Sequence, residues 1–256
     1  MNKWINGRAF KPCALAALSC GVLVGCGGGG GGTTDTGAVK PPTDTTPVVA
    51  PFNAASAQGR WTQADLTAFV LPAQAGAAEV WMVNQAASYL YKYEIASTAK
   101  ASGFKYSLSG ANPREAVSGD ATLNASVTPK TLSFANGGLS AFNLTQADAL
   151  TGNSVLSDIS GNWSFTIAAG AVKMDATIGA QGAFAASTVS DDCSYTGQLS
   201  STSAAAVFKI TYQSNCQGVV SNLSGIARWQ AANKLLNILA VSTDGASATL
   251  ISMQKP

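Results

Sequence analysis

Apolar and polar residues alternate in short runs along most of this chain. In residues 172–178 every even position is apolar or small and the odd positions are polar, and residues 208–213 repeat the pattern. Residues 89–95 and 104–108 also alternate, with aromatic side chains on one side of each run. A period of two is typical of strands that bury one face. No comparable window has helical periodicity, although residues 143–150 are expected to form a short helix.

The second half of the chain contains eight candidate strands separated by turns. They span residues 162–168, 171–178, 182–188, 193–199, 206–213, 223–230, 234–242 and 246–253. Residues 61–145 contain seven or eight strands that are less distinct. Many short strands with tight turns predict an all-β protein, with one or two small antiparallel up-and-down barrels or a sandwich.

Two segments, about a hundred residues apart, begin with the same pattern. Gly59-Arg60-Trp61-Thr62 and Gly161-Asn162-Trp163-Ser164 share a Gly-x-Trp start. We expect Trp61 and Trp163 each to lie at the start of a first strand and to close one end of a β unit. Trp163 is expected to stack under Arg228, as cations do on aromatic faces.

The first 25 residues have the character of a secretion signal. Residues 1–12 contain Lys3, Arg8 and Lys11 and no acid, and residues 13–25 are apolar or small. The apolar stretch is too short for a spanning helix. Leu23-Val24-Gly25-Cys26 resembles a bacterial lipobox, and this resemblance implies that Cys26 carries lipid and becomes the first residue of the mature protein. A plain signal peptide with a chance cysteine is the alternative.

A tether follows the expected lipidation site. Six glycines begin at residue 27, and residues up to 56 are rich in Thr, Asp and Pro. Such a segment has no apolar face to bury and is expected to be flexible. The expected organisation is therefore a signal peptide (1–25), the lipidated cysteine and tether (26–56), an N-terminal β unit (57–157) and a C-terminal eight-stranded β unit (158–256).

Charge and composition narrow the classes of function. Three of the 15 Lys and Arg residues lie in the expected signal peptide, which leaves 12 against 13 Asp and Glu. No basic patch indicates nucleic-acid binding. The chain has no histidine, which removes Ser-His-Asp and Cys-His catalysis and the commonest zinc ligand. We therefore expect no enzyme activity, no metal and no cofactor.

Two glutamates on neighbouring predicted strands are a candidate glycosidase pair. If the turn between these strands centres on Ala86, Glu79 lies opposite Tyr93 and Trp81 lies opposite Tyr91. A slip by one residue would place Glu79 opposite Glu94, where like charges repel. The first register is therefore expected, and the glutamates are interpreted as strand surface residues.

Six aromatic residues are the candidate ligand-facing set, because they are expected to share one face of neighbouring strands. They are Trp81, Tyr89, Tyr91, Tyr93, Phe104 and Tyr106. An eight-stranded barrel is either filled by side chains or holds one small ligand. Core packing is the simpler interpretation, but buried tyrosine hydroxyls need partners, which keeps ligand binding open.

A disulfide is expected between the two cysteines that lie outside the signal peptide and are not the lipidation site. Cys13 and Cys20 lie in the signal peptide, so Cys193 and Cys216 remain, and the compartment is oxidising. An in-register antiparallel hairpin that pairs the two cysteines places Leu199 opposite Ile210. It keeps the apolar residues of both strands on one side.

The Gly-x-Trp start resembles the opening of lipocalin-like barrels. The whole chain is also similar to uncharacterised proteobacterial lipoproteins with a poly-Gly tether. Residues 59–61, 69–72, 193–197, 216 and 224–227 carry that resemblance. It implies β-barrel units and lends no activity.

We expect a non-enzymatic envelope lipoprotein, a membrane-tethered β module with a binding or structural role. Gly27, which follows Cys26, favours the outer membrane by analogy. One alternative is a lipocalin-like carrier of a small apolar ligand, and the other is an envelope hydrolase, which the lack of histidine makes the weakest. The expected partners are the membrane, through Cys26, and either a small apolar ligand or another envelope protein.

Overall fold

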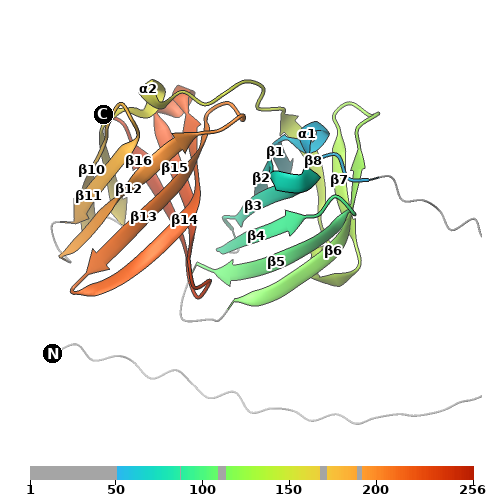
Figure 1. Ribbon diagram of the computed structural model, residues 1–256, viewed down its shortest axis with the longest axis horizontal. Coiled ribbons are helices and arrows are strands. Elements are labelled where there is room, and N and C mark those ends of the chain that lie inside the picture. Colours follow the sequence, from blue (N-terminus) through green and yellow to red (C-terminus); the bar gives the residue numbers. More distant parts are fainter. Residues whose placement is uncertain (1–50, 87, 109–113, 168–171, 189–191) are drawn as a thin grey trace, which may run out of the picture. The chain divides into compact units, whose positions relative to one another are not determined.

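The computed structural model describes residues 51–256, except residues 87, 109–113, 168–171 and 189–191. It is almost entirely β, as the alternating pattern predicted. Two closed antiparallel barrels follow one another along the chain, and each contains eight strands that pair in sequence order. Figure 1 shows the first barrel in blue to green and the second in yellow to red.

The first barrel is built from strands that are joined mostly by tight turns. It consists of β1 (Gly59–Gln63), β2 (Leu66–Pro72), β3 (Ala78–Asn84), β4 (Tyr89–Ile95), β5 (Lys100–Ser107), β6 (Glu115–Asn124), β7 (Thr131–Ala135) and β8 (Asn143–Asp148). The helix α1 (Ala54–Ala57) precedes it, and the short 3-10 helices η1 (Gln74–Gly76) and η2 (Gly137–Leu139) lie between strands. Pairing of β1 with β8 closes the barrel.

The second barrel repeats this plan. It consists of β9 (Gly161–Ile167), β10 (Val172–Ile178), β11 (Ala183–Thr188), β12 (Cys193–Ser201), β13 (Val207–Cys216), β14 (Val219–Gln230), β15 (Leu235–Ser242) and β16 (Ala248–Gln254). The helix α2 (Leu156–Ile159) precedes β9, and η3 (Ala231–Asn233) joins β14 to β15. All eight strands predicted for this half of the chain are confirmed.

A short helix precedes each barrel and accepts a hydrogen bond from a buried tryptophan of the first strand. Trp61 Nε1 donates to the Ala57 carbonyl of α1 at 2.9 Å, and Trp163 Nε1 donates to the Ile159 carbonyl of α2 at 2.9 Å. Both side chains are almost fully buried. At Gly59 a Cβ atom would lie 2.6 Å from the Asp148 carbonyl oxygen, so the start of β1 requires glycine. The expected position of both tryptophans is confirmed.

The described residues from 51 to 256 form one compact unit with three buried clusters. One cluster fills each barrel. The third lies between the barrels, where Trp81 and Leu90 of the first barrel pack with Ile226 and Leu239 of the second. On the outer faces, Trp81 and Val83 of β3 and Ile226 of β14 are therefore buried like the inner positions of these strands.

The structure confirms the hairpin register that was derived from the cysteines. Cys193 lies opposite Cys216 and Leu199 lies opposite Ile210. A disulfide joins the cysteines, whose Cα atoms are 4.1 Å apart. The predicted pairing was correct along all of this hairpin because its apolar residues, apart from Val207, occupy the inner face.

Three local predictions were wrong. Residues 143–148 form β8 and not a helix, because pairing with β1 and β7 overrides local propensity. Glu79 lies opposite Glu94, one residue from the expected register. The like charges are tolerated because Glu79 accepts a hydrogen bond from Trp81 Nε1 at 2.9 Å and forms an ion pair with Lys209 of the second barrel.

The third wrong prediction concerns the partner of Trp163. Its ring packs edge-to-face on Trp229 with centroids 5.4 Å apart, and Lys255 Nζ lies 5.7 Å from its centroid. Arg228 precedes Trp229 in β14. Since successive side chains of a strand point to opposite faces, Arg228 lies on the outside of the barrel and cannot reach the Trp163 ring.

Candidate ligand-binding cavity

A cavity of about 520 Å³ lies inside the second barrel, at the end that carries the disulfide. Its wall comes from β9, β10, β12, β13, β14 and β16. The lining residues that alternate toward the barrel axis are Phe165, Met174, Tyr195, Tyr212, Ser214, Leu223, Thr249 and Ile251. The volume is within the roughly 300–1,000 Å³ that small-molecule sites usually have.

The distribution of large side chains explains why the cavity lies at this end. The opposite end is filled by Trp163, Trp229, Leu236 and Met253, with Ile159 of α2 packed against them. At the disulfide end, the inward positions of β13 and β16 hold the small hydroxyl residues Ser214 and Thr249. A barrel of eight strands encloses just enough space for side chains to fill it, so small residues at one end leave a cavity there.

The seam between the first and last strands of this barrel also forms part of the cavity wall. In the part of the chain that the structure describes, β9 and β16 pair at a single position, where Gln254 lies opposite Ser164. That position is near the filled end. Toward the disulfide end the described residues of the two strands make no further pairing, and Leu250 and Ser252 of β16 join the cavity wall. The cavity therefore extends to this seam.

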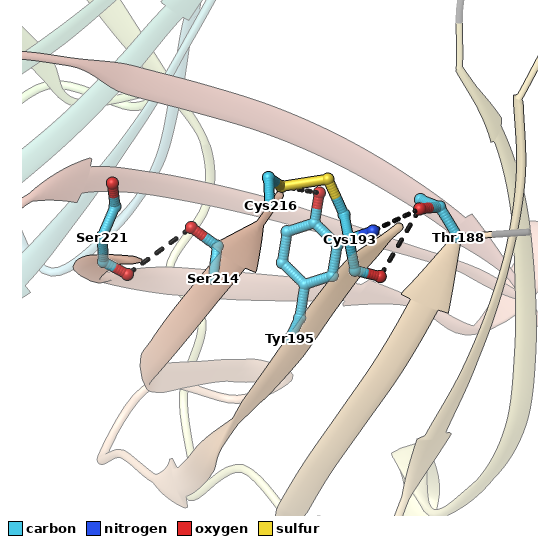
Figure 2. The surroundings of a disulfide bond; sticks show 6 residues. All are labelled: Thr188, Cys193, Tyr195, Ser214, Cys216 and Ser221. Atoms are coloured by element: carbon cyan, nitrogen blue, oxygen red, sulfur yellow. Dashed lines mark hydrogen bonds between the residues drawn. A yellow bond between two sulfur atoms is a disulfide. The ribbon is translucent and has the colours of Figure 1, made fainter. Parts of the chain in front are cut away.

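The disulfide fixes the rim of the cavity. Figure 2 shows Tyr195 below the sulfur bridge, with its hydroxyl 3.9 Å from Cys216 Sγ. Thr188 of β11 binds the backbone of Cys193 on the other side, where its Oγ1 accepts from the Cys193 amide at 3.0 Å. The bridge and this hydrogen bond hold β11, β12 and β13 together at the open end.

Aromatic rings form one side of the cavity. Tyr195 and Tyr212 have ring centroids 6.3 Å apart, and Phe184 packs edge-to-face behind Tyr212 at 6.1 Å. Burial raises the pKa of the Tyr212 hydroxyl above its ordinary value, and the neighbouring Tyr195 raises it further. Tyr212 therefore stays neutral at physiological pH. The cavity offers apolar surface and hydroxyl groups, and none of its lining residues is an acid or a base of the Asp, Glu, Lys or Arg type.

The six aromatic residues that were expected to lie on one ligand-facing side belong to two different clusters. Tyr89, Tyr91 and Tyr93 belong to the interior cluster of the first barrel. The other three, Trp81, Phe104 and Tyr106, lie in the cluster between the barrels. The expectation of one common face is wrong because Trp81 and Phe104 both lie opposite Lys92, on the other side of the sheet from Tyr91.

The three tyrosines of the first barrel are part of a packed interior. Tyr91 meets Phe142 edge-to-face with centroids 5.3 Å apart, and Tyr93 meets Phe134 in the same way at 5.7 Å. The Tyr93 hydroxyl is buried and has no hydrogen-bond partner among the described residues. Burial raises the pKa of this hydroxyl well above its ordinary value, and Tyr91 adds to the effect.

Sequence reasoning did not single out the residues that line the observed cavity. A signal for them was present in the predicted hairpin, where Tyr195 lies opposite Ser214. A large aromatic residue and a small polar one on the same inner face leave space beside each other. The expected lipidation site Cys26 lies outside the described residues, whereas Cys193 and Cys216 form the expected bridge.

Two other features of the described residues concern metal binding and membrane spanning. They contain no group of three or more Cys, Asp and Glu side chains placed to hold a metal ion. None of the helices described is both long enough and apolar enough to cross a bilayer. Comparison with known protein families, with curated proteins and with solved structures finds no match. The geometry of the cavity is therefore the basis for a functional proposal.

Proposed function

We propose that this protein is a non-enzymatic lipoprotein of the bacterial outer membrane whose second barrel binds a small apolar ligand. In this proposal Cys26 carries the lipid and the following Gly- and Thr-rich segment tethers the barrels. The single observation that supports ligand binding is the cavity of about 520 Å³ at the disulfide end of the second barrel. The first barrel, with its packed tyrosines, has a structural role.

The lining indicates the kind of ligand. Phe165, Met174, Leu223 and Ile251 provide apolar surface, which favours an apolar body. The hydroxyl groups of Ser214 and Thr249 can bond a single polar group. A charged ligand would be desolvated beside neutral walls without a counter-ion, which is unfavourable. The preferred ligand is therefore neutral, or has its charge at the mouth.

Apolar surface continues beyond the cavity at its mouth. Val219 lies on the same face of β14 as Leu223 and is 69% exposed, and Val220 is 52% exposed. Exposed apolar residues next to an apolar cavity provide a path of low desolvation cost for an apolar molecule. This supports entry at the disulfide end.

The proposal is tested by binding of N-phenyl-1-naphthylamine, an apolar fluorescent probe, to the full-length protein. Ser214→Phe fills the cavity from the inner face of β13 and is expected to weaken probe binding at least about tenfold, or 1.4 kcal/mol. Asn215→Phe is the matched control, because it adds the same ring one residue further on the exposed outer face of the same strand. The control is expected to bind like the wild type.

Two results would contradict the proposal. One is a wild-type protein that does not bind the probe. The other is equal binding by the Ser214→Phe and Asn215→Phe variants, since this would place the probe elsewhere on the protein. Thermal melting of both variants is the control that tests whether each remains folded.

A further inference from the structure

A second hollow, of about 460 Å³, lies between the two barrels and has a different chemical character from the cavity. Its walls come from the outer faces of β1, β2 and β14 and from η3. The side chains that define it are Arg60, Thr67, Phe69, Arg228, Gln230 and Asn233. We call it the arginine groove, because two guanidinium groups face it.

Arg228 is held in place by the backbone of its own barrel. Its Nη1 donates to the Ala206 carbonyl at 3.2 Å, and the Ala205 carbonyl lies at 3.5 Å. Its side chain is 14% exposed. A guanidinium has five N–H donors, so this anchoring leaves donors that point elsewhere.

Among the described residues, the only carboxylate paired with Arg228 compensates its charge weakly. Asp148 Oδ2 lies 4.0 Å from Arg228 Nη2, beyond hydrogen-bond distance. The other carboxylate oxygen accepts a hydrogen bond from the Leu150 amide at 3.0 Å. The Asp148 side chain is 46% exposed, so water screens much of its interaction with Arg228.

Arg60 adds a second positive charge. In β1 it lies opposite Phe69 on one side and opposite Asp148 on the other. Within the described residues its guanidinium makes no hydrogen bond and no ion pair, and it faces the same groove as Arg228. Burial lowers the pKa of Arg228, and its neighbour Arg60 lowers it further while Asp148 opposes them. Arg228 nevertheless remains charged at physiological pH, because a guanidinium group is a very weak acid.

Two guanidinium groups in one partly buried groove repel each other, and the half-exposed Asp148 balances only one of them. Coulomb repulsion is stronger there than in water because the effective dielectric is lower. An anion with two or more oxygen atoms would accept the free N–H donors and remove the imbalance. We propose that the arginine groove binds the phosphate or carboxylate group of a small soluble molecule.

The remaining walls suit such a ligand. The Gln230 and Asn233 side chains carry amide N–H groups that can donate to further anion oxygens. Phe69 provides an apolar wall beside Arg60 for the rest of the molecule. This site is separate from the barrel cavity, so the two kinds of ligand do not compete for the same residues.

The test is calorimetric titration of the full-length protein with inorganic phosphate and with citrate, at constant ionic strength. Arg60→Gln is expected to weaken binding by about tenfold or more, because it removes charge-assisted hydrogen bonds. Asp148→Asn is expected to strengthen binding, since it removes the competing charge while Oδ1 can still accept from the Leu150 amide. Lys234→Gln is the matched control, because Lys234 adjoins Asn233 but does not line the groove.

Opposite effects of the Arg60 and Asp148 variants, with an unchanged control, would support the proposal. No binding of either anion to the wild type would overturn it, as would equal weakening by Arg60→Gln and Lys234→Gln. Binding only to phosphatidylglycerol vesicles, and to neither soluble anion, would also overturn it. Probe binding in the barrel cavity, measured on the same samples, reports separately on the proposed function and on folding.

Discussion

Loss of the Cys193–Cys216 disulfide is predicted to destabilise the second barrel and to loosen the rim of its cavity. The bridge joins residues 23 positions apart, at the open end of the β12–β13 hairpin. On the chain-entropy account, closing a loop of this length stabilises the folded state by about 3 kcal/mol. For a compact unit of this size, each kcal/mol corresponds to about 2–4 °C. The variant Cys193→Ala/Cys216→Ala is therefore expected to melt about 6–12 °C below the wild type.

The measurement is thermal unfolding of the full-length wild type and of the double variant, each with and without dithiothreitol. The reductant is expected to lower the melting temperature of the wild type toward that of the variant and to leave the variant unchanged. N-phenyl-1-naphthylamine binding is expected to weaken in parallel, because Tyr195 packs under the bridge at the cavity rim. A double variant that melts within about 2 °C of the wild type, with unchanged probe binding, would refute this reasoning.

Three further predictions concern other parts of the chain. Tyr93→Phe is expected to raise stability at neutral pH by about 1 kcal/mol, because it removes a buried hydroxyl that has no partner among the described residues. The raised pKa of Tyr93 contributes stability that is present below about pH 10 and is lost as pH rises further. Above pH 10 the melting temperature is therefore expected to fall less steeply with pH for the variant than for the wild type. An equal slope would contradict the assignment. Trp61→Phe and Trp163→Phe are each expected to cost about 1–2 kcal/mol, since each removes a buried hydrogen bond to the preceding helix, and unchanged denaturation midpoints would argue against this role. Cys26→Ser is expected to abolish labelling by a palmitate analogue and to release the protein from the membrane fraction; retained label would show that the anchor lies elsewhere.

The second barrel could be predicted in detail because its strands show the alternation clearly. The outer face of β12 and of most of β13 is polar, so only one register of this hairpin buries Leu199 and Ile210 together. The two cysteines identify the same register independently. Sequence and structure agree here because the hydrophobic pattern has a single solution.

The first barrel was harder to predict because several of its strands are buried on both faces. In β3, Val80 and Met82 face the barrel interior, while Trp81 and Val83 face the second barrel. An alternating pattern cannot distinguish two apolar faces, and the expected register was wrong by one residue. The expected aromatic face failed for the same reason.

Neither candidate site could be derived from the sequence, because both depend on contacts between distant strands. The cavity requires Ser214 and Thr249 to meet at the same end of the barrel as Tyr195 and Tyr212. The arginine groove requires β1 of one barrel to lie beside β14 of the other. Alternation identifies inward and outward positions, but it does not show which side chains share one end.

The most direct test of the central proposal is native mass spectrometry of the full-length protein, purified from its native host cells under non-denaturing conditions. The account predicts a non-covalent adduct of a small apolar molecule on the wild type and on Asn215→Phe. The adduct is predicted to be absent from Ser214→Phe, whose added ring occupies the cavity. A wild-type protein without an adduct that also fails to bind added apolar probe, or an adduct retained equally by Ser214→Phe, would contradict the account.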